Sequence, residues 1–64
     1  MMWPMMRPYV EMYRGYRIAV YQQSGGLMVA MATKFHRGGW IGFNCEGPTA
    51  TYVIHKAMHR IARE

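Results

Sequence analysis

The sequence predicts an α+β domain in which a three-stranded antiparallel sheet is followed by one C-terminal helix that packs on one face of the sheet. Two observations predict this β-β-β-α order. Three short segments in which apolar and other residues alternate are separated by glycine pairs, the pattern of consecutive antiparallel strands. One amphipathic stretch follows them, and its apolar stripe has to be buried against the sheet, which gives two layers.

Length and charge exclude several classes of protein. The chain has 64 residues, too few for two domains of the usual ~100–200 residues, and its single cysteine cannot form a disulfide within the chain. It has no apolar run near the roughly 18 residues of a membrane span and no secretion signal, so we expect a cytoplasmic protein without a membrane partner. Eight Lys and Arg against three Asp and Glu give a net charge of +5, which attracts phosphate groups.

Residues 1–12 show no regular period, and two prolines interrupt any helix there. We expect a flexible or loosely packed N-terminal segment, with residues 13–64 forming a single βββα domain. In the alternative interpretation, Trp3, Met5 and Met6 cover an apolar surface on this chain or on a partner, because indole and thioether groups are large and adaptable.

The three expected strands cover residues 13–23, 27–36 and 40–45, with turns at the glycine pairs between them. Alternation along a strand assigns every second side chain to the side that faces the helix. On that side we expect Ile18, Val20, Leu27, Val29, Met31, Phe35, Ile41, Phe43 and Cys45.

The expected helix runs from about Ala50 to Ala62, where apolar residues recur with helical spacing. Thr49 is the expected N-cap and Thr51 the competing one, because a threonine hydroxyl accepts a hydrogen bond from a free amide of the first turn. The residues of the stripe that should meet the sheet are Val53, Ala57 and Ile61.

The opposite sheet face is then the candidate working surface. Its expected centre is small and apolar, with Ala30 and Ala32 among aromatic and basic side chains, whereas a solvated face is usually plainly polar. Three occupants fit such a flat surface: the chain's own N-terminal segment, a second copy related by a two-fold axis, or nucleic acid. The predicted contact residues for nucleic acid or a partner are Arg17, Tyr21, Lys34, His36, Arg37 and Trp40.

The sequence does not favour catalysis or metal binding. The three glutamates are too dispersed to form a catalytic carboxylate pair, and Cys45 is interpreted as a core residue that points away from His36. His55 and His59 have the i, i+4 spacing of a metal-binding pair, but no third ligand or catalytic glutamate accompanies them, which favours two solvated histidines. We therefore expect no enzymatic activity, no metal, no cofactor and no small-molecule substrate.

Residues 13–18, Tyr-Arg-Gly-Tyr-Arg-Ile, together with Gly25-Gly26 and a Gly47-Pro48 element before the helix, resemble a group of small bacterial βββα domains. The resemblance covers about residues 13–62 and implies the same fold, but it implies no activity, because that family has no established one. The element order is also similar to the three-stranded DNA-binding domains of some phage-type integrases, which place their sheet in the major groove. The residues that would contact DNA by that similarity are Arg17, Tyr21, Lys34, His36 and Arg37.

The leading hypothesis is thus a small non-enzymatic interaction domain that binds nucleic acid through a basic and aromatic outer sheet face. The alternative is a homo-oligomerisation or protein-docking module that uses Trp40, Met28 and the alanines of the same face. Charge-reversal substitutions discriminate between the two, because phosphate binding depends directly on the cations.

Overall fold

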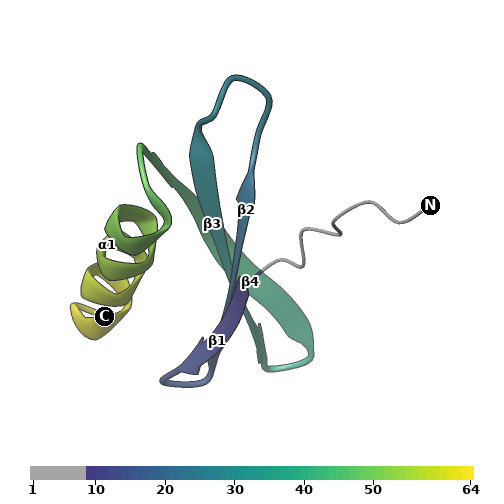
Figure 1. Cartoon of the computed structure of the whole chain (residues 1–64). Helices are drawn as coiled ribbons and strands as arrows, with labels where there is room; N and C mark the ends of the chain where they lie inside the picture. Colours follow the sequence, from purple (N-terminus) through teal and green to yellow (C-terminus); the bar gives the residue numbers. More distant parts are fainter. Residues whose placement is uncertain (1–8) are drawn as a thin grey trace.

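The computed structural model describes residues 9–64, which form a four-stranded antiparallel sheet and one helix (Figure 1). The elements are β1 Tyr9–Tyr13, β2 Tyr16–Gln22, β3 Met28–His36, β4 Gly39–Gly47 and α1 Ala50–Ala62. The strands lie side by side in chain order, and each pair is antiparallel. Because α1 lies on one face of the sheet, the fold has two layers (Figure 1).

The prediction of three strands is wrong, because residues 9–13 form a fourth strand at one edge of the sheet. β1 pairs with β2, and Tyr13 lies opposite Tyr16. The sequence prediction placed the two residues between them inside one long strand. Arg14 and Gly15 instead have positive φ angles of 51° and 85°, the geometry of a two-residue hairpin turn, so the chain reverses there.

The expected N-terminal segment, residues 1–12, is described only from Tyr9 onwards, and its last four residues belong to β1. The covering role suggested for Trp3, Met5 and Met6 concerns residues that lie outside the described part of the chain.

The predicted face assignment of β3 is also wrong. Ala30 and Ala32 are completely buried in the cluster beneath α1, whereas Met31 and Phe35 are 38% and 58% exposed. The strand pairing agrees with this, because Ala32 lies opposite Ile18, a core residue of β2. Val29, Met31 and Phe35 therefore alternate onto the face away from the helix. Met28, predicted to lie on that outer face, instead packs against the cluster on the helix side.

Close packing between the helix and the sheet gives the physical reason. β3 is a central strand that contacts α1, and at such a contact a methyl group fits where a longer side chain would hold the two layers apart. Ala57 of the helix is fully buried as well. Hydrophobicity alone assigned the larger Leu27 and Val29 to this side, yet Leu27 is partly exposed and Val29 is buried without belonging to the cluster under the helix.

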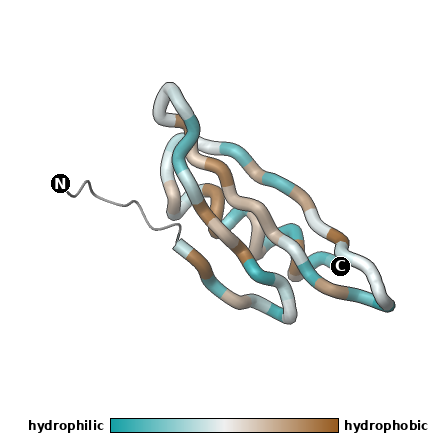
Figure 2. The backbone as a smooth tube through the Cα atoms, turned by 90° about the vertical axis from the view of Figure 1, so that its right-hand side faces the viewer, coloured by the Kyte–Doolittle hydropathy of each residue, from teal (hydrophilic) through white to brown (hydrophobic). Residues whose placement is uncertain are grey.

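The predicted helix and the inner faces of β2 and β4 are confirmed. Thr49 is the N-cap, and its hydroxyl oxygen accepts a hydrogen bond from the amide of Tyr52 at 3.1 Å. Figure 2 shows hydrophobic and hydrophilic residues following one another along the strands. The buried cluster consists of Tyr16, Ile18, Val20, Ala30, Ala32, Cys45, Val53, Ala57 and Ile61.

The helix is shorter than β3 and β4, the two longest strands, and this difference exposes one end of the sheet. The 13 residues of α1 span about 20 Å, whereas the nine residues of β3 or β4 span about 30 Å. The C-terminal end of the helix reaches only as far as Tyr16 and Phe43. The Tyr16 hydroxyl donates to the Glu64 carboxylate, and the Arg60 guanidinium lies over the Phe43 ring. Ile41, two residues nearer the β3–β4 turn, is consequently 45% exposed although it alternates onto the helix side.

Candidate functional site

Two short turns of the same chemistry lie at the same end of the sheet. Arg14-Gly15 joins β1 to β2 and Arg37-Gly38 joins β3 to β4, and antiparallel order brings both to the lower end in Figure 1. Both arginines have positive φ angles, 51° and 52°, and are exposed. We call this the turn end, defined by Arg14, Arg17, Lys34, Phe35, His36, Arg37 and Trp40.

The turn end carries an exposed aromatic pair. Phe35 and Trp40 lie opposite each other on β3 and β4, and their rings meet edge to face with centroids 5.3 Å apart. Trp40 is 71% exposed, the largest exposure among the large hydrophobic residues described. Both rings remain largely exposed on the side of the sheet away from α1.

Cations lie over aromatic rings on the helix side of the same end. The Lys34 ammonium lies 5.1 Å from the centroid of the Tyr16 ring, and the Arg60 guanidinium lies 4.3 Å from that of Phe43. Such contacts hold a charged group near the surface while leaving it hydrated. Cations and aromatic rings therefore occur on both faces of the turn end.

The predicted contact residues are only partly brought together. Arg17 and Trp40 lie on the outer face, as predicted, and Arg37 lies in the turn beside them. The placement of Lys34 and His36 on that face is wrong, because the inverted alternation of β3 directs both to the helix side. Five of the six residues still lie at the turn end.

Tyr21 is the sixth predicted residue, and it lies towards the opposite end of the sheet. It pairs with Val29 near the β2–β3 loop, on the outer face. A ligand confined to the turn end would not reach it.

Two residues of the turn end were missed by the sequence reasoning. Phe35 was assigned to the core, and Arg14 was placed inside a strand and left out of the predicted contact residues. The signal that could have found both is the repeated Arg-Gly dipeptide, because a two-residue turn at Arg37-Gly38 fixes Phe35 opposite the exposed Trp40.

The outer face of the sheet is mostly apolar rather than basic. Val10, Ala19 and Met31 follow one another across three strands, and the exposed Met12 lies beside them on β1. Among the described strand residues, Arg17 is the only Lys or Arg that the pairing places on this face. The prediction that the outer face is basic is therefore wrong, and most of the predicted basic residues lie at the turn end instead.

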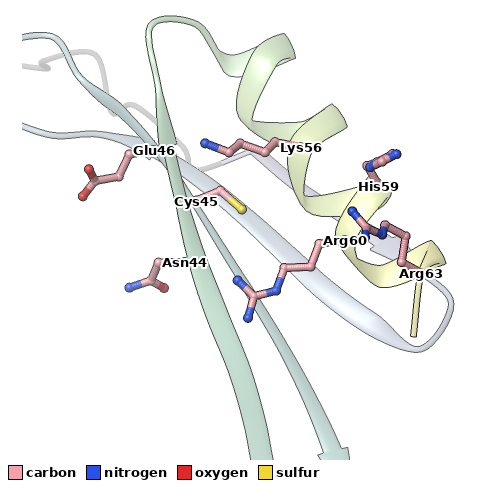
Figure 3. A pocket seen from close by; sticks show the side chains of 7 residues that line it. All are labelled: Asn44, Cys45, Glu46, Lys56, His59, Arg60 and Arg63. Atoms are coloured by element: carbon pink, nitrogen blue, oxygen red, sulfur yellow. The ribbon is translucent and has the colours of Figure 1, made fainter.

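A hollow lies between β4 and α1 on the helix side of the sheet (Figure 3). Its volume is about 780 Å³, and Cys45 points into it whereas Asn44 and Glu46 point away from the helix (Figure 3). Four of its lining residues come from one face of α1. They are Lys56, His59, Arg60 and Arg63.

The possible metal ligands and the titratable groups of the described residues are dispersed. No three His, Cys, Asp or Glu side chains gather within residues 9–64, and His55 and His59 are both exposed. The clearest pKa effects concern tyrosines: the hydrogen bond to Glu64 raises the pKa of Tyr16, and that to Glu11 raises the pKa of Tyr9. Over the same residues, no helix is long and apolar enough to cross a membrane.

Comparison of the chain with protein-family models, with curated proteins and with solved structures finds no match.

Proposed function

We propose that this domain binds single-stranded nucleic acid through the turn end. The observation that carries the proposal is the pair of exposed arginines, Arg14 and Arg37, held with positive φ in two turns at the same end of the sheet. Asparagine, aspartate or glycine adopts that geometry at lower cost, so two arginines there suggest a role for the side chain. A guanidinium group binds phosphate oxygens in a bidentate manner and stays charged at every physiological pH.

The aromatic pair supports the same function. Proteins that bind single strands combine cations for the phosphates with exposed rings on which unpaired bases stack. Phe35 and Trp40 provide the rings, with Arg37 between them in the chain and Arg17 on the same face of the sheet. A net charge of +5 adds long-range attraction for a polyanion.

Fluorescence anisotropy with a labelled oligothymidine of about 12 nucleotides tests the proposal. We expect binding that weakens with salt, with a log–log slope of about −0.7 for each phosphate contact. The double variant Arg14→Glu, Arg37→Glu should lower both affinity and slope. Trp40→Ala should lower affinity and leave the slope unchanged, because stacking releases no counterions.

The matched control is the double variant Lys56→Glu, Arg63→Glu, which changes the net charge equally on the helix. The proposal is wrong if the native protein does not bind at low salt, or if the two double variants lose affinity equally. Circular dichroism of each variant confirms that the fold is retained.

The outer sheet face favours a second candidate function, self-association. Val10 and Met12 of β1 and Met31 of β3, with Ala19 of β2 between them, form an apolar band over three adjacent strands, and a two-fold axis would bury this band against its own copy. Sedimentation equilibrium at several hundred micromolar tests it. A dimer that Met31→Lys dissociates supports this function, and a native monomer at that concentration excludes it.

A further inference from the structure

The free edge of β4 is the starting point for a separate inference. β4 is the last strand of the sheet and pairs only with β3 in the described part of the chain. It is nine residues long, and Glu46 is its single charged residue. Edge strands of this length usually carry charges, prolines or bulges that prevent pairing with another chain. Along most of its length, β4 leaves every second amide and carbonyl directed outwards and open to a further strand.

The hollow beside this edge is strongly basic. Lys56 and Arg60 extend from α1 towards β4, and His59 and the C-cap residue Arg63 lie further along the helix (Figure 3). A strand added to β4 would lie below them, with alternate side chains directed towards the helix. Two residues of a strand advance about 6.6 Å, and four residues of a helix advance about 6 Å. The spacing of side chains at i and i+2 of an added strand is therefore similar to the rise along α1 from Lys56 to Arg60.

The positive charge beside β4 argues against a second copy of this chain as the strand that adds to this edge. Antiparallel pairing of β4 with β4 of another copy would bring two basic helix faces together, and Glu46, the acid among the lining residues, points away from the helix (Figure 3). The same charge is complementary to carboxylates. Nucleic acid fits the edge poorly, because its phosphodiester backbone offers no N–H donors for the outward carbonyls of β4.

We propose that an extended acidic segment of a partner protein adds to β4 as a fifth strand, with carboxylates at alternate positions facing Lys56, Arg60 and Arg63. Main-chain hydrogen bonds to β4 provide the affinity common to strand addition, and the charge pairs select an acidic sequence. The basic groups that would hold the segment lie beside the second half of β4, at Asn44–Glu46, whereas Arg14 and Arg37 lie in the turns before β2 and before β4.

A synthetic peptide tests the inference directly. The probe is an acetylated and amidated peptide of about eight residues, long enough to span β4, in which Glu alternates with Val and Thr. Titration into isotopically labelled protein should shift the resonances of β4 and α1 and slow hydrogen exchange at alternate β4 amides. The matched peptide with Gln in place of Glu should bind at least about tenfold more weakly.

Two N-methylated peptides separate strand addition from simple charge attraction. Methylation of every second amide removes the donors from one edge of the peptide and leaves its charge unchanged. One of the two alternating patterns should abolish binding and the other should preserve it. Equal binding by both patterns, or no loss of affinity with the Gln peptide, would overturn the proposal.

The two double variants distinguish this inference from the proposed function. Lys56→Glu with Arg63→Glu should lower peptide affinity at least about tenfold, and Arg14→Glu with Arg37→Glu should leave it within about twofold. Oligothymidine binding should respond in the opposite order. If oligothymidine displaces the peptide competitively, the hollow between β4 and α1 is part of a nucleic-acid site and the peptide proposal is wrong.

Discussion

Arg14 and Arg37 occupy backbone positions at which a side chain other than Asn, Asp or Gly is strained. We predict that Arg14→Asn and Arg37→Asn each increase the free energy of unfolding by about 1 kcal/mol, because asparagine tolerates left-handed geometry. Both substitutions should also weaken oligothymidine binding. Urea unfolding and anisotropy measure the two effects. Unchanged or reduced stability would show that these arginines carry no backbone strain.

Gly42 lies in β4 where the chain passes very close to β3. A Cβ atom there would lie 2.5 Å from the backbone carbonyl oxygen of Ala32, which cannot move without disturbing the strand pairing. Gly42→Ala should therefore reduce stability by about 1–3 kcal/mol. Gly39→Ala is the matched control, since a Cβ at that position of the same strand meets no atom within 4 Å. Thermal unfolding of both variants should separate them clearly, and similar melting temperatures would contradict the prediction.

Tyr16 links the first turn to the end of the chain through its hydroxyl, which donates to Glu64 at 2.9 Å. This hydrogen bond, followed by burial and the Glu64 charge, raises the pKa of Tyr16 above its ordinary value of 10.0. The neutral form is thus favoured in the native state, so its contribution to stability is complete below pH 10 and is lost as the pH rises through the raised pKa. Between about pH 9 and about pH 11, the melting temperature should fall more steeply for the native protein than for Tyr16→Phe.

At the scale of single elements, α1 is defined at its start by one threonine. The Thr49 hydroxyl accepts from the amide of Tyr52, whereas Thr51 lies inside the helix and is exposed. Thr49→Ala should cost about 1 kcal/mol of stability. Thr51→Ala should be neutral or slightly stabilising, because alanine has the higher helix propensity. A larger loss from Thr51→Ala than from Thr49→Ala would show that the helix begins elsewhere.

The sequence determines some elements more clearly than others, for physical reasons. The helix and β2 were predicted because their branched aliphatic residues, such as Ile18 and Val53, lie in or against the buried cluster. The same reasoning fails for β3, because its fully buried residues beneath the helix are Ala30 and Ala32, while Met31 and Phe35 are exposed on the other side. β1 was missed because a strand at the edge needs little hydrophobic patterning.

The whole molecule explains why the candidate site was only partly predictable. The residue types were identified from charge and aromatic content, and most of them do lie together at the turn end. Their arrangement depends on strand pairing and on the length of the helix relative to the sheet, neither of which a single strand pattern contains. Inverting β3 alone moved Lys34 and His36 to the helix side and brought Phe35 to Trp40.

The short helix also predicts where the molecule opens most easily. Residues 28–33 of β3 lie between two strands and include Ala30 and Ala32 beneath α1, whereas residues 34–40 extend past the C-terminal turn of the helix. Local opening requires the least free energy where few apolar contacts are buried. Averaged over each segment, amides of residues 34–40 should exchange with deuterium at least about tenfold faster than those of residues 28–33.

This difference follows from the two-layer arrangement and not from the hairpin itself, so a change in the helix should alter it. Ile61→Ala weakens the last contact of α1 with the sheet, and it should extend fast exchange from the β3–β4 turn towards Ala32 and Phe43. Exchange followed by mass spectrometry resolves the segments. Uniform acceleration over the whole sheet would mean that the domain opens as one cooperative unit, and the turn end would then be as rigidly held as the core.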